Sequence, residues 1–172
     1  MTWNTIETLL FALGKLVFVA YFLLFLFAVA VERKVSSLVI ALMVLAVANG
    51  AMTAITPLLY EMASQPGLFY KFLWYAVFIL FDFVAIFLLY KFHRLLKQNV
   101  GRIAHLVGLS FLMLAMIQTL RFFDRYVTNT DVFQALYQYG VPFINVILVP
   151  LIIILWGIHV KAEQKRIQVV LG

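Results

Sequence analysis

Residues 9–31 read LLFALGKLVFVAYFLLFLFAVAV and carry one charged side chain, Lys15, in 23 positions. A helix needs about 20 mostly apolar residues to cross the hydrocarbon core of a bilayer. Four further stretches have this character, at residues 38–59, 72–90, 103–120 and 139–160. Open strands cannot satisfy their backbone groups in lipid, so each stretch is expected to be a helix. The sequence therefore predicts an all-α integral membrane protein, a single domain over residues 1–172 with a bundle of five transmembrane helices.

The composition of the chain supports this prediction and excludes several alternatives. Hydrophobic residues make up 66% of the 172 residues, and charged residues only 12%. A water-soluble domain of this size must expose a large share of its residues and cannot hide so much apolar surface. The chain contains no cysteine, which excludes disulfides, thiolate metal sites and thiol catalysis.

Basic residues gather in alternate segments between the predicted helices. Nine of the 13 Lys and Arg residues follow the first, third or fifth stretch, whereas the opposite segments hold three basic and four acidic residues. Cytoplasmic segments carry the excess of Lys and Arg, so we expect the N-terminus outside and the C-terminus in the cytoplasm, in a bacterial cell (inner) membrane. The residues of this predicted cytoplasmic basic face are Arg33, Lys34, Lys91, Arg94, Lys97, Arg102, Lys161, Lys165 and Arg166.

Polar side chains inside the predicted helices are the first candidates for function, because their burial in a membrane is costly. With a rise of about 1.5 Å per residue, Asn49 and Asp82 fall near the bilayer centre, and the others fall in its outer third, level with Tyr75. If these groups face one another, they form a polar cavity that narrows inward. The residues of this predicted ion path or buried polar layer are Lys15, Asn49, Thr53, Asp82, Gln118 and Asn145.

Asp82 is the sharpest of these signals, because it is the only charged residue in its stretch. As a functional residue it would be the protonatable group of an ion or proton path. As a structural residue it would be neutral, or hydrogen-bonded to Asn49 or Tyr75. Pairing with Lys15 would have to bridge about 10 Å along the membrane normal, and that lysine can instead extend to the outer surface. We expect the structural role.

The second stretch has a clear packing face. Ala46, Gly50 and Ala54 recur every fourth residue, a pattern of small residues that lets helix backbones approach closely. The pattern does not say whether the partner helix belongs to the same chain or to another copy.

Prolines and polar residues indicate where helices end or bend. Pro57 is expected to mark the end of the second helix, and Pro142 and Pro150 to kink the last one. Asp131 followed by Gln134 resembles a capping box, so helical structure is expected to begin before the fifth stretch.

Signatures of cofactors and catalysis are weak in this sequence. His93, His105 and His159 fall at the cytoplasmic boundary, where we expect them to be solvated. A haem between His105 and His159 is conceivable, but no stretch contains two histidines, so we expect no cofactor and no metal. There is also no phosphate-binding glycine loop and no serine nucleophile beside a base, so we expect no enzyme. The basic face is ordinary for a membrane protein and does not indicate nucleic-acid binding.

Two functions remain for such a chain. The first is a non-enzymatic subunit that forms a homo-oligomer in the bilayer and anchors or signals to a cytosolic or membrane partner through its basic cytoplasmic face. The second is a small ion or proton channel or transporter whose polar path passes the layer of Asn49 and Asp82. The small-residue face favours the first function, and the buried polar layer favours the second.

Overall fold

The computed structural model describes the backbone of residues 3–171 and the side chains of residues 12–161. No strand occurs in this part of the chain, so the all-helical prediction is confirmed. Its elements are α1 (Trp3–Glu32), α2 (Ser37–Ser64), α3 (Leu68–Leu95), α4 (Arg102–Tyr126), the π-helical segment η1 (Leu136–Gly140) and α5 (Val141–Leu171).

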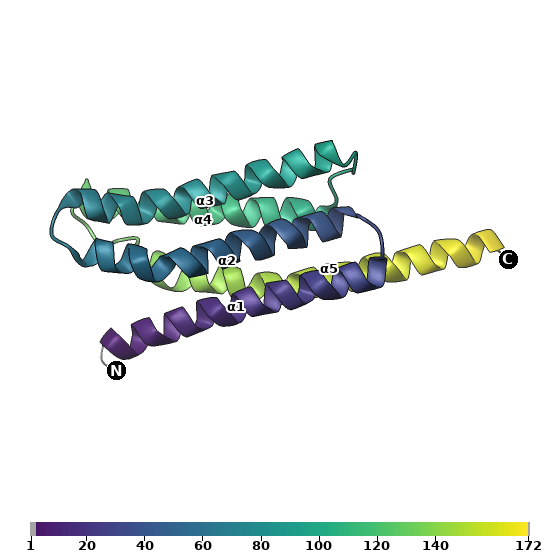
Figure 1. The fold of residues 1–172 in the computed structure, drawn as a ribbon, viewed down its shortest axis with the longest axis horizontal. Coiled ribbons are helices and arrows are strands. Elements are labelled where there is room, and N and C mark those ends of the chain that lie inside the picture. The colour runs from purple at the N-terminus through teal and green to yellow at the C-terminus, as the bar shows by residue number, and fades with distance from the viewer. Residues whose placement is uncertain (1–2, 172) are drawn as a thin grey trace.

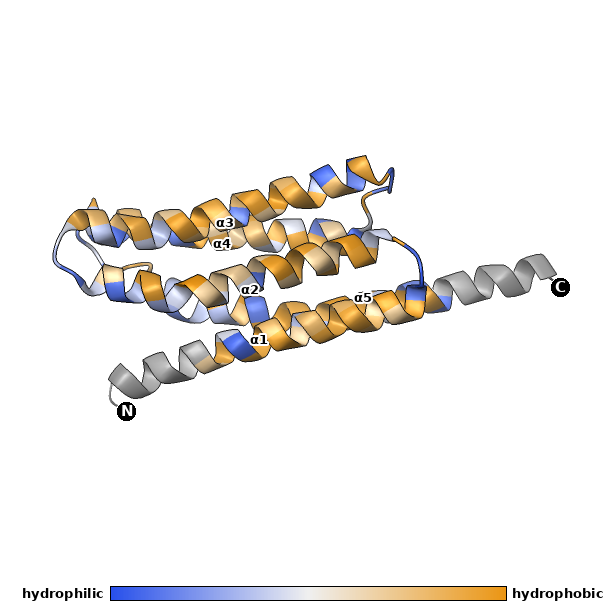
Figure 2. Cartoon of the chain, viewed as in Figure 1, coloured by the Kyte–Doolittle hydropathy of each residue, from blue (hydrophilic) through white to orange (hydrophobic). Residues whose placement is uncertain are grey.

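Five segments of the described chain are long and apolar enough to cross a membrane, as the sequence predicts. They are Ala12–Glu32, Ser37–Ser64, Leu68–Leu95, Arg102–Tyr126 and Leu136–Lys161. In Figure 2 apolar residues cover most of each helix, and hydrophilic residues gather mainly near the helix ends. The chain is therefore a multi-pass membrane protein.

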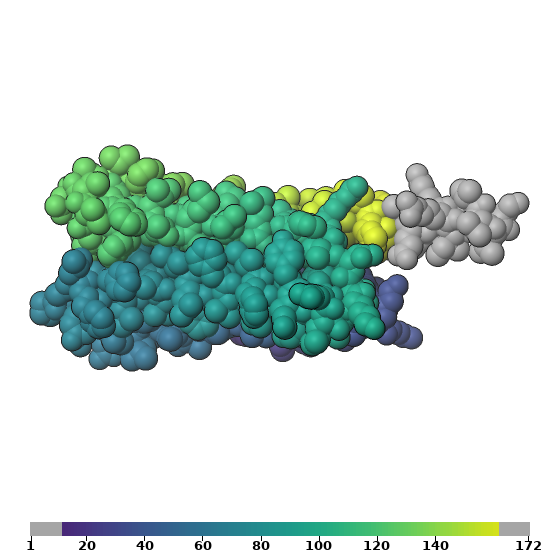
Figure 3. Space-filling model, turned by 90° about the horizontal axis from the view of Figure 1, so that it is seen from above, coloured from purple at the N-terminus to yellow at the C-terminus, as the bar shows by residue number. Residues whose placement is uncertain are grey.

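The helices lie roughly parallel or antiparallel to one another in a bundle (Figure 1). Helix α3 packs against α2 and α4, while α1 and α5 pack against each other and against α2 and α4 respectively. Figure 3 shows α3 and α4 side by side on one face, with the connection to α5 at one end. Connections 33–36 and 96–101 share one end of the bundle, which we call the basic end. Connections 65–67 and 127–133 share the other, which we call the opposite end.

Helices α1 and α5 are the least covered by the rest of the chain. In the most apolar window of each, 17% of the residues are buried, compared with 56% in α4. The uncovered side chains are large and apolar, for example Phe27 on α1 and Ile154 on α5. Such faces are compatible with lipid, in which apolar exposure carries no hydrophobic penalty.

The small-residue face of α2 has its partner within the same chain. A Cβ added at Gly50 would lie 2.7 Å from Cε2 of Phe18, so the ring of α1 packs directly on the α2 backbone. Ala46 is buried, whereas Ala54 is exposed. The close approach that the small residues permit therefore joins α1 to α2 near Gly50.

Pro57 does not end the second helix, and that expectation is wrong. It lies inside α2, which continues to Ser64. Proline removes one backbone hydrogen bond, but membrane helices tolerate this loss because their remaining backbone must stay helical in lipid. After α2, Gly67 adopts a φ of 120° and begins the turn into α3, a conformation that favours glycine.

Helical structure begins before the predicted fifth stretch, as expected. Gln134 and Ala135 are already helical, and η1 follows directly. Pro142 is the second residue of α5 and has no N–H to give to the carbonyl of Gln138, so one α-helical hydrogen bond is missing where η1 passes into α5. Pro150 lies within α5, which runs on as one continuous helix.

Candidate functional site

A cavity of about 400 Å³ lies between the helices toward the opposite end. Among the described residues, each α-helix contributes to its wall, through Gly14 of α1, Asn49 of α2, Tyr75 of α3, Arg121 of α4 and Asn145 of α5. This size falls within the range of about 300–1,000 Å³ that is typical of small-molecule sites.

Aromatic side chains from α3 and η1 form one wall of the cavity. Trp74 donates a hydrogen bond from Nε1 to the hydroxyl of Tyr137 over 2.9 Å. The ring of Tyr75 packs against that of Tyr137, with centroids 5.7 Å apart. These contacts join the rings into one continuous wall.

The amides of two asparagines, Asn49 and Asn145, also line the cavity. Asn49 and Asn145 each donate from Nδ2 to the carbonyl four residues earlier in their helix, that of Leu45 over 3.3 Å and that of Val141 over 3.0 Å. Their side-chain oxygens are left as acceptors. Nearby, the buried Tyr21 of α1 donates its hydroxyl proton to the backbone carbonyl of Asn145 over 2.6 Å, which ties α1 to α5.

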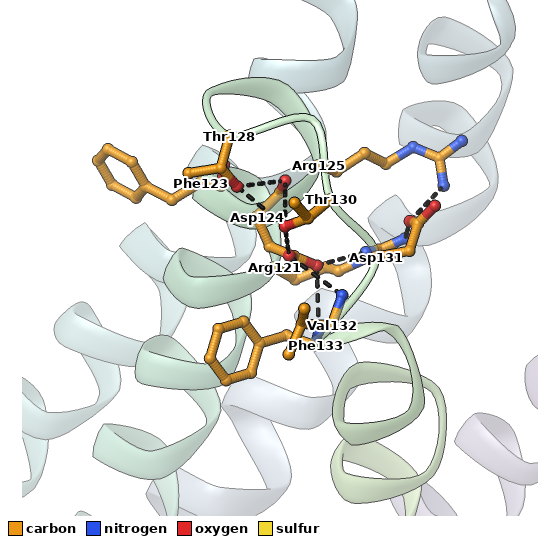
Figure 4. Close-up of polar contacts among 9 residues, drawn as sticks. All are labelled: Arg121, Phe123, Asp124, Arg125, Thr128, Thr130, Asp131, Val132 and Phe133. Atoms are coloured by element: carbon orange, nitrogen blue, oxygen red, sulfur yellow. Dashed lines mark hydrogen bonds and ion pairs between the residues drawn. The ribbon is translucent and has the colours of Figure 1, made fainter.

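Arg121 is the buried cation of the cavity wall, with only 3% of its surface exposed. Its Nη1 donates to Oδ2 of Asp124 and its Nη2 to Oδ1 of Asp131, both over 2.9 Å. Arg125, which also lines the cavity, lies 3.7 Å from the same oxygen of Asp131. These four residues form the ionic cluster shown in Figure 4.

Asp124 shapes the connection between α4 and α5. Its carboxylate accepts the backbone N–H of Val132 over 3.2 Å and that of Phe133 over 3.0 Å, and it also accepts the hydroxyl of Thr130. Figure 4 shows the loop folded around this carboxylate. The ionic cluster therefore fixes both Arg121 and the start of the last helix.

The predicted capping box is corrected by this geometry. The carboxylate of Asp131 pairs with Arg121, and only its backbone carbonyl accepts the N–H of Gln134, over 3.2 Å. The side chain that satisfies the N–H groups before η1 is Asp124, which comes from the preceding helix. Because Asp124 lies outside residues 131–134, the spacing of residues within that range could not predict it as the capping side chain.

No protein-family model, curated protein or solved structure matches this chain. Its function therefore has to rest on its own site, since a helical membrane bundle implies no particular activity.

The structure separates the residues of the predicted polar layer. Asn49 and Asn145 line the cavity, whereas the other four are not part of its wall. Lys15 is exposed on α1 and Thr53 is half-buried on α2. Gln118 is buried on α4, and its Oε1 has no hydrogen-bond partner among the described residues.

Asp82 is buried, with 1% of its surface exposed, and lies outside the cavity wall. Neither of its carboxylate oxygens has a hydrogen-bond partner in the described part of the chain. The expected alternatives of a bond to Asn49, a bond to Tyr75 or a pair with Lys15 are therefore not found.

The position of Asp82 along the bundle follows from contacts on either side of it. The ring of Tyr75 packs against that of Phe122 on α4, and Leu89 approaches Gly108 of the same helix. Asp82 lies midway between these contacts on α3, so it lies level with the middle of α4. The carboxylate is thus enclosed near the centre of the bundle.

The basic end contains a second buried polar cluster, and there the expectation of solvated histidines is wrong for His93. His93 is 1% exposed. Its Nδ1 lies 2.7 Å from the carbonyl of Leu89, and its Nε2 lies 2.8 Å from the hydroxyl of Ser37. The same hydroxyl accepts the N–H of Gly101 over 2.8 Å. We call Ser37, Leu89, His93 and Gly101 the neutral cluster, because none of them is Asp, Glu, Lys or Arg.

His105 and His159 are exposed, as expected for solvated histidines. The described side chains of the predicted basic face are also exposed, namely Arg33, Lys34, Lys91, Arg94, Lys97, Arg102 and Lys161. Lys165 and Arg166 lie outside the residues whose side chains are described.

Sequence reasoning missed Arg121 and Asp124 as site residues. The predicted fourth stretch ends at residue 120, which places both residues in the segment beyond the membrane helix. The helix instead continues to Tyr126. The available signal was the i, i+3 spacing of opposite charges directly after an apolar run, which places the two side chains on one face of a helix.

Proposed function

We propose that this protein is a small transporter that binds a solute in the cavity between its helices. The cavity carries the proposal, because a space of about 400 Å³ between membrane helices, with arginine and asparagine side chains set among apolar ones, is suited to hold a solute. Polar and charged side chains within membrane helices are costly and typically mark substrate pathways. Residues from each described α-helix reach this space, so movements between helices would change its shape.

The interior toward the basic end favours a gated transporter over an open channel. Past the cavity, the core is filled by buried apolar side chains, including Leu42, Leu45, Leu89 and Phe111. A solute in the cavity would meet this packed region before it could leave by the basic end. Transport would then require the helices to rearrange, as in alternating access.

The proposed orientation places the basic end in the cytoplasm of a bacterial cell and the cavity toward the outside. Exposed Lys and Arg side chains at the basic end support this orientation through the positive-inside bias. Reporter fusions after Arg102 and at the C-terminus should then report the cytoplasm, and fusions at Gln65 and Asn129 the outside. A cytoplasmic reporter at Asn129 would overturn the orientation.

Two glycines allow the transport proposal to be tested with a matched control. A Cβ at Gly14, which lines the cavity, or at Gly157 would have no atom of the described chain within 4 Å. The Cβ of a leucine therefore meets open space at either position, but only position 14 lines the cavity. In proteoliposomes screened with a panel of small organic anions, cations and neutral solutes, Gly14→Leu should lower protein-dependent uptake at least about tenfold, whereas Gly157→Leu should not. Equal uptake by both variants would overturn the proposal.

A second candidate function is the oligomeric membrane subunit with a partner at its basic face. The sparse coverage of α1 and α5 supports it, because helices that expose most of their surface can meet another copy. Native mass spectrometry of the protein released from nanodiscs would distinguish a homo-oligomer from a monomer, and co-purification would reveal a partner. A strictly monomeric particle without a partner would count against this function.

A further inference from the structure

The geometry points to an amphiphilic organic anion as the ligand of the cavity, with its acid group at Arg121 and Arg125 and its apolar body against the aromatic wall. This inference rests on the proposed function, in that it names the class of solute that the cavity binds. An anionic lipid would present the same chemistry, because its acidic headgroup is attached to an apolar body.

The charge of the cavity wall is the first observation that favours an anion. Among the described residues that line the cavity, Arg121 and Arg125 are charged and no carboxylate is present. Asp124 and Asp131 contact Arg121 from outside the wall. The two aspartates pair with the buried arginine, yet the charged groups of the cavity wall itself are guanidinium groups.

The second step is the unused hydrogen-bonding capacity of Arg121. A guanidinium has five N–H donors in a fixed fork. Arg121 gives one bond to Asp124 and one to Asp131, so three donors are unused among the described contacts. Its side chain is held rigidly by the ionic cluster and removed from water, and both conditions strengthen a charge-assisted bond to a carboxylate or phosphate.

Arg125 complements this fixed donor with an adjustable one. Half of its side chain is exposed, and its 3.7 Å separation from Asp131 is longer than a hydrogen bond. Arg125 can therefore turn toward an incoming acid group without breaking a strong contact. Arg121 is thus held in place while Arg125 can move, and the two guanidinium groups could bind one anion between them.

The apolar part of the wall would contact the apolar body of the ligand. Val17, Val141 and Pro142 line the cavity together with the rings of Trp74 and Tyr137. These surfaces would bury an aliphatic or aromatic body by the hydrophobic effect. An organic ammonium could also stack on the rings, but the two arginines of the same cavity would repel it.

Trp74 provides a reporter for a direct test, because it lines the cavity. The test uses the Trp3→Phe, Trp156→Phe double variant, which keeps Trp74 as its single tryptophan, in nanodiscs of zwitterionic lipid. The probes are 11-bromoundecanoate, 11-bromoundecanol and 11-bromoundecyltrimethylammonium, whose bromine quenches tryptophan fluorescence on contact. At equal concentrations in the bilayer, the carboxylate should quench saturably and at least about tenfold more tightly than either of the others. Equal quenching by the three probes, or preference for the ammonium, would overturn the inference.

Matched variants connect the binding to the arginines. Arg125→Gln should weaken quenching by the carboxylate about tenfold, whereas Arg94→Gln, which removes the same charge at the exposed basic end, should leave it unchanged. Anionic phosphatidylglycerol in the nanodisc should compete if a lipid headgroup is the occupant, and should have no effect if a free acid is. Saturable binding of the acid without uptake into proteoliposomes would refute transport and keep the ligand class. Uptake of another solute without binding of the acid would refute the ligand class and keep transport.

Discussion

The two buried polar clusters of this bundle differ in charge and in completeness. At the opposite end, the ionic cluster joins Arg121 to Asp124 and Asp131, and Arg121 also lines a cavity. At the basic end, the neutral cluster joins α2, α3 and the start of α4 through Ser37, His93 and Gly101. Arg121 of the first cluster keeps N–H donors without a partner among the described residues, whereas the second cluster is closed upon itself.

The closure of the neutral cluster follows from its hydrogen-bond directions. The carbonyl of Leu89 can only accept, so Nδ1 of His93 carries the proton of the ring. In the neutral ring Nε2 then accepts the proton of the Ser37 hydroxyl, whose oxygen in turn accepts the N–H of Gly101. Each donor finds an acceptor within the chain, which suits an end of the bundle that stays packed.

The largest effect is expected from the ionic cluster. Asp124→Asn should lower the free energy of unfolding by about 3–5 kcal/mol, because it leaves the buried Arg121 without its buried partner. Unfolding in detergent followed by circular dichroism measures this change. Asp131→Asn is the control, because the Asp131 side chain is 61% exposed, and it should cost less than about 1 kcal/mol. Equal losses in the two variants would mean that burial does not distinguish the two ion pairs.

A smaller effect is expected from the neutral cluster. Ser37→Ala should lower the free energy of unfolding by about 1–3 kcal/mol, since Nε2 of the buried His93 and the N–H of Gly101 both lose their partner. Ser64→Ala removes an exposed hydroxyl that donates to the carbonyl of Tyr60 and should change stability by less than about 0.5 kcal/mol. If both serine variants unfold alike in the same assay, the neutral cluster does not hold the basic end together.

The smallest effect is expected from Asp82, a buried acid with no hydrogen-bond partner among the described residues. Asp82→Asn breaks no ion pair and should change the free energy of unfolding by less than about 1 kcal/mol, in contrast to Asp124→Asn. A loss as large as that of Asp124→Asn would show that Asp82 is charged and paired. Unchanged stability with lost pH-dependent uptake into proteoliposomes would instead make Asp82 a proton-carrying residue.

The sequence predicted the helices well because a membrane span has a local signature. About 20 apolar residues in a row identify a spanning helix whatever it packs against. The errors lie at helix ends, where one polar contact decides the outcome. Pro57 was expected to end α2, yet the chain stays helical for seven more residues in an apolar setting that leaves the backbone no other partners.

The site was only partly predictable, because polar partners are chosen by packing between helices. Depth along the membrane placed Asn49 and Asn145 in the polar layer, and both line the cavity. The depth of a residue in the membrane does not tell which way its side chain faces around the helix axis. The sequence therefore could neither assign the remaining four residues to the cavity nor exclude them from it, namely Lys15, Thr53, Asp82 and Gln118. The burial of His93 likewise depends on Ser37, 56 residues away in the sequence.

The π-helical segment η1 behaves as a one-residue insertion within the wall of the cavity. An α-helix turns by about 100° per residue, so an extra residue rotates everything on one side of it relative to the other. That rotation lets Tyr137 and Gln138 share the cavity with Val141 and Asn145. Deletion of a single residue from 136–140 would remove that extra rotation and turn the preceding side chains toward another face. The shape of the cavity is thus encoded by chain length as well as by residue type, and relatives with one residue fewer in this segment would present a different wall.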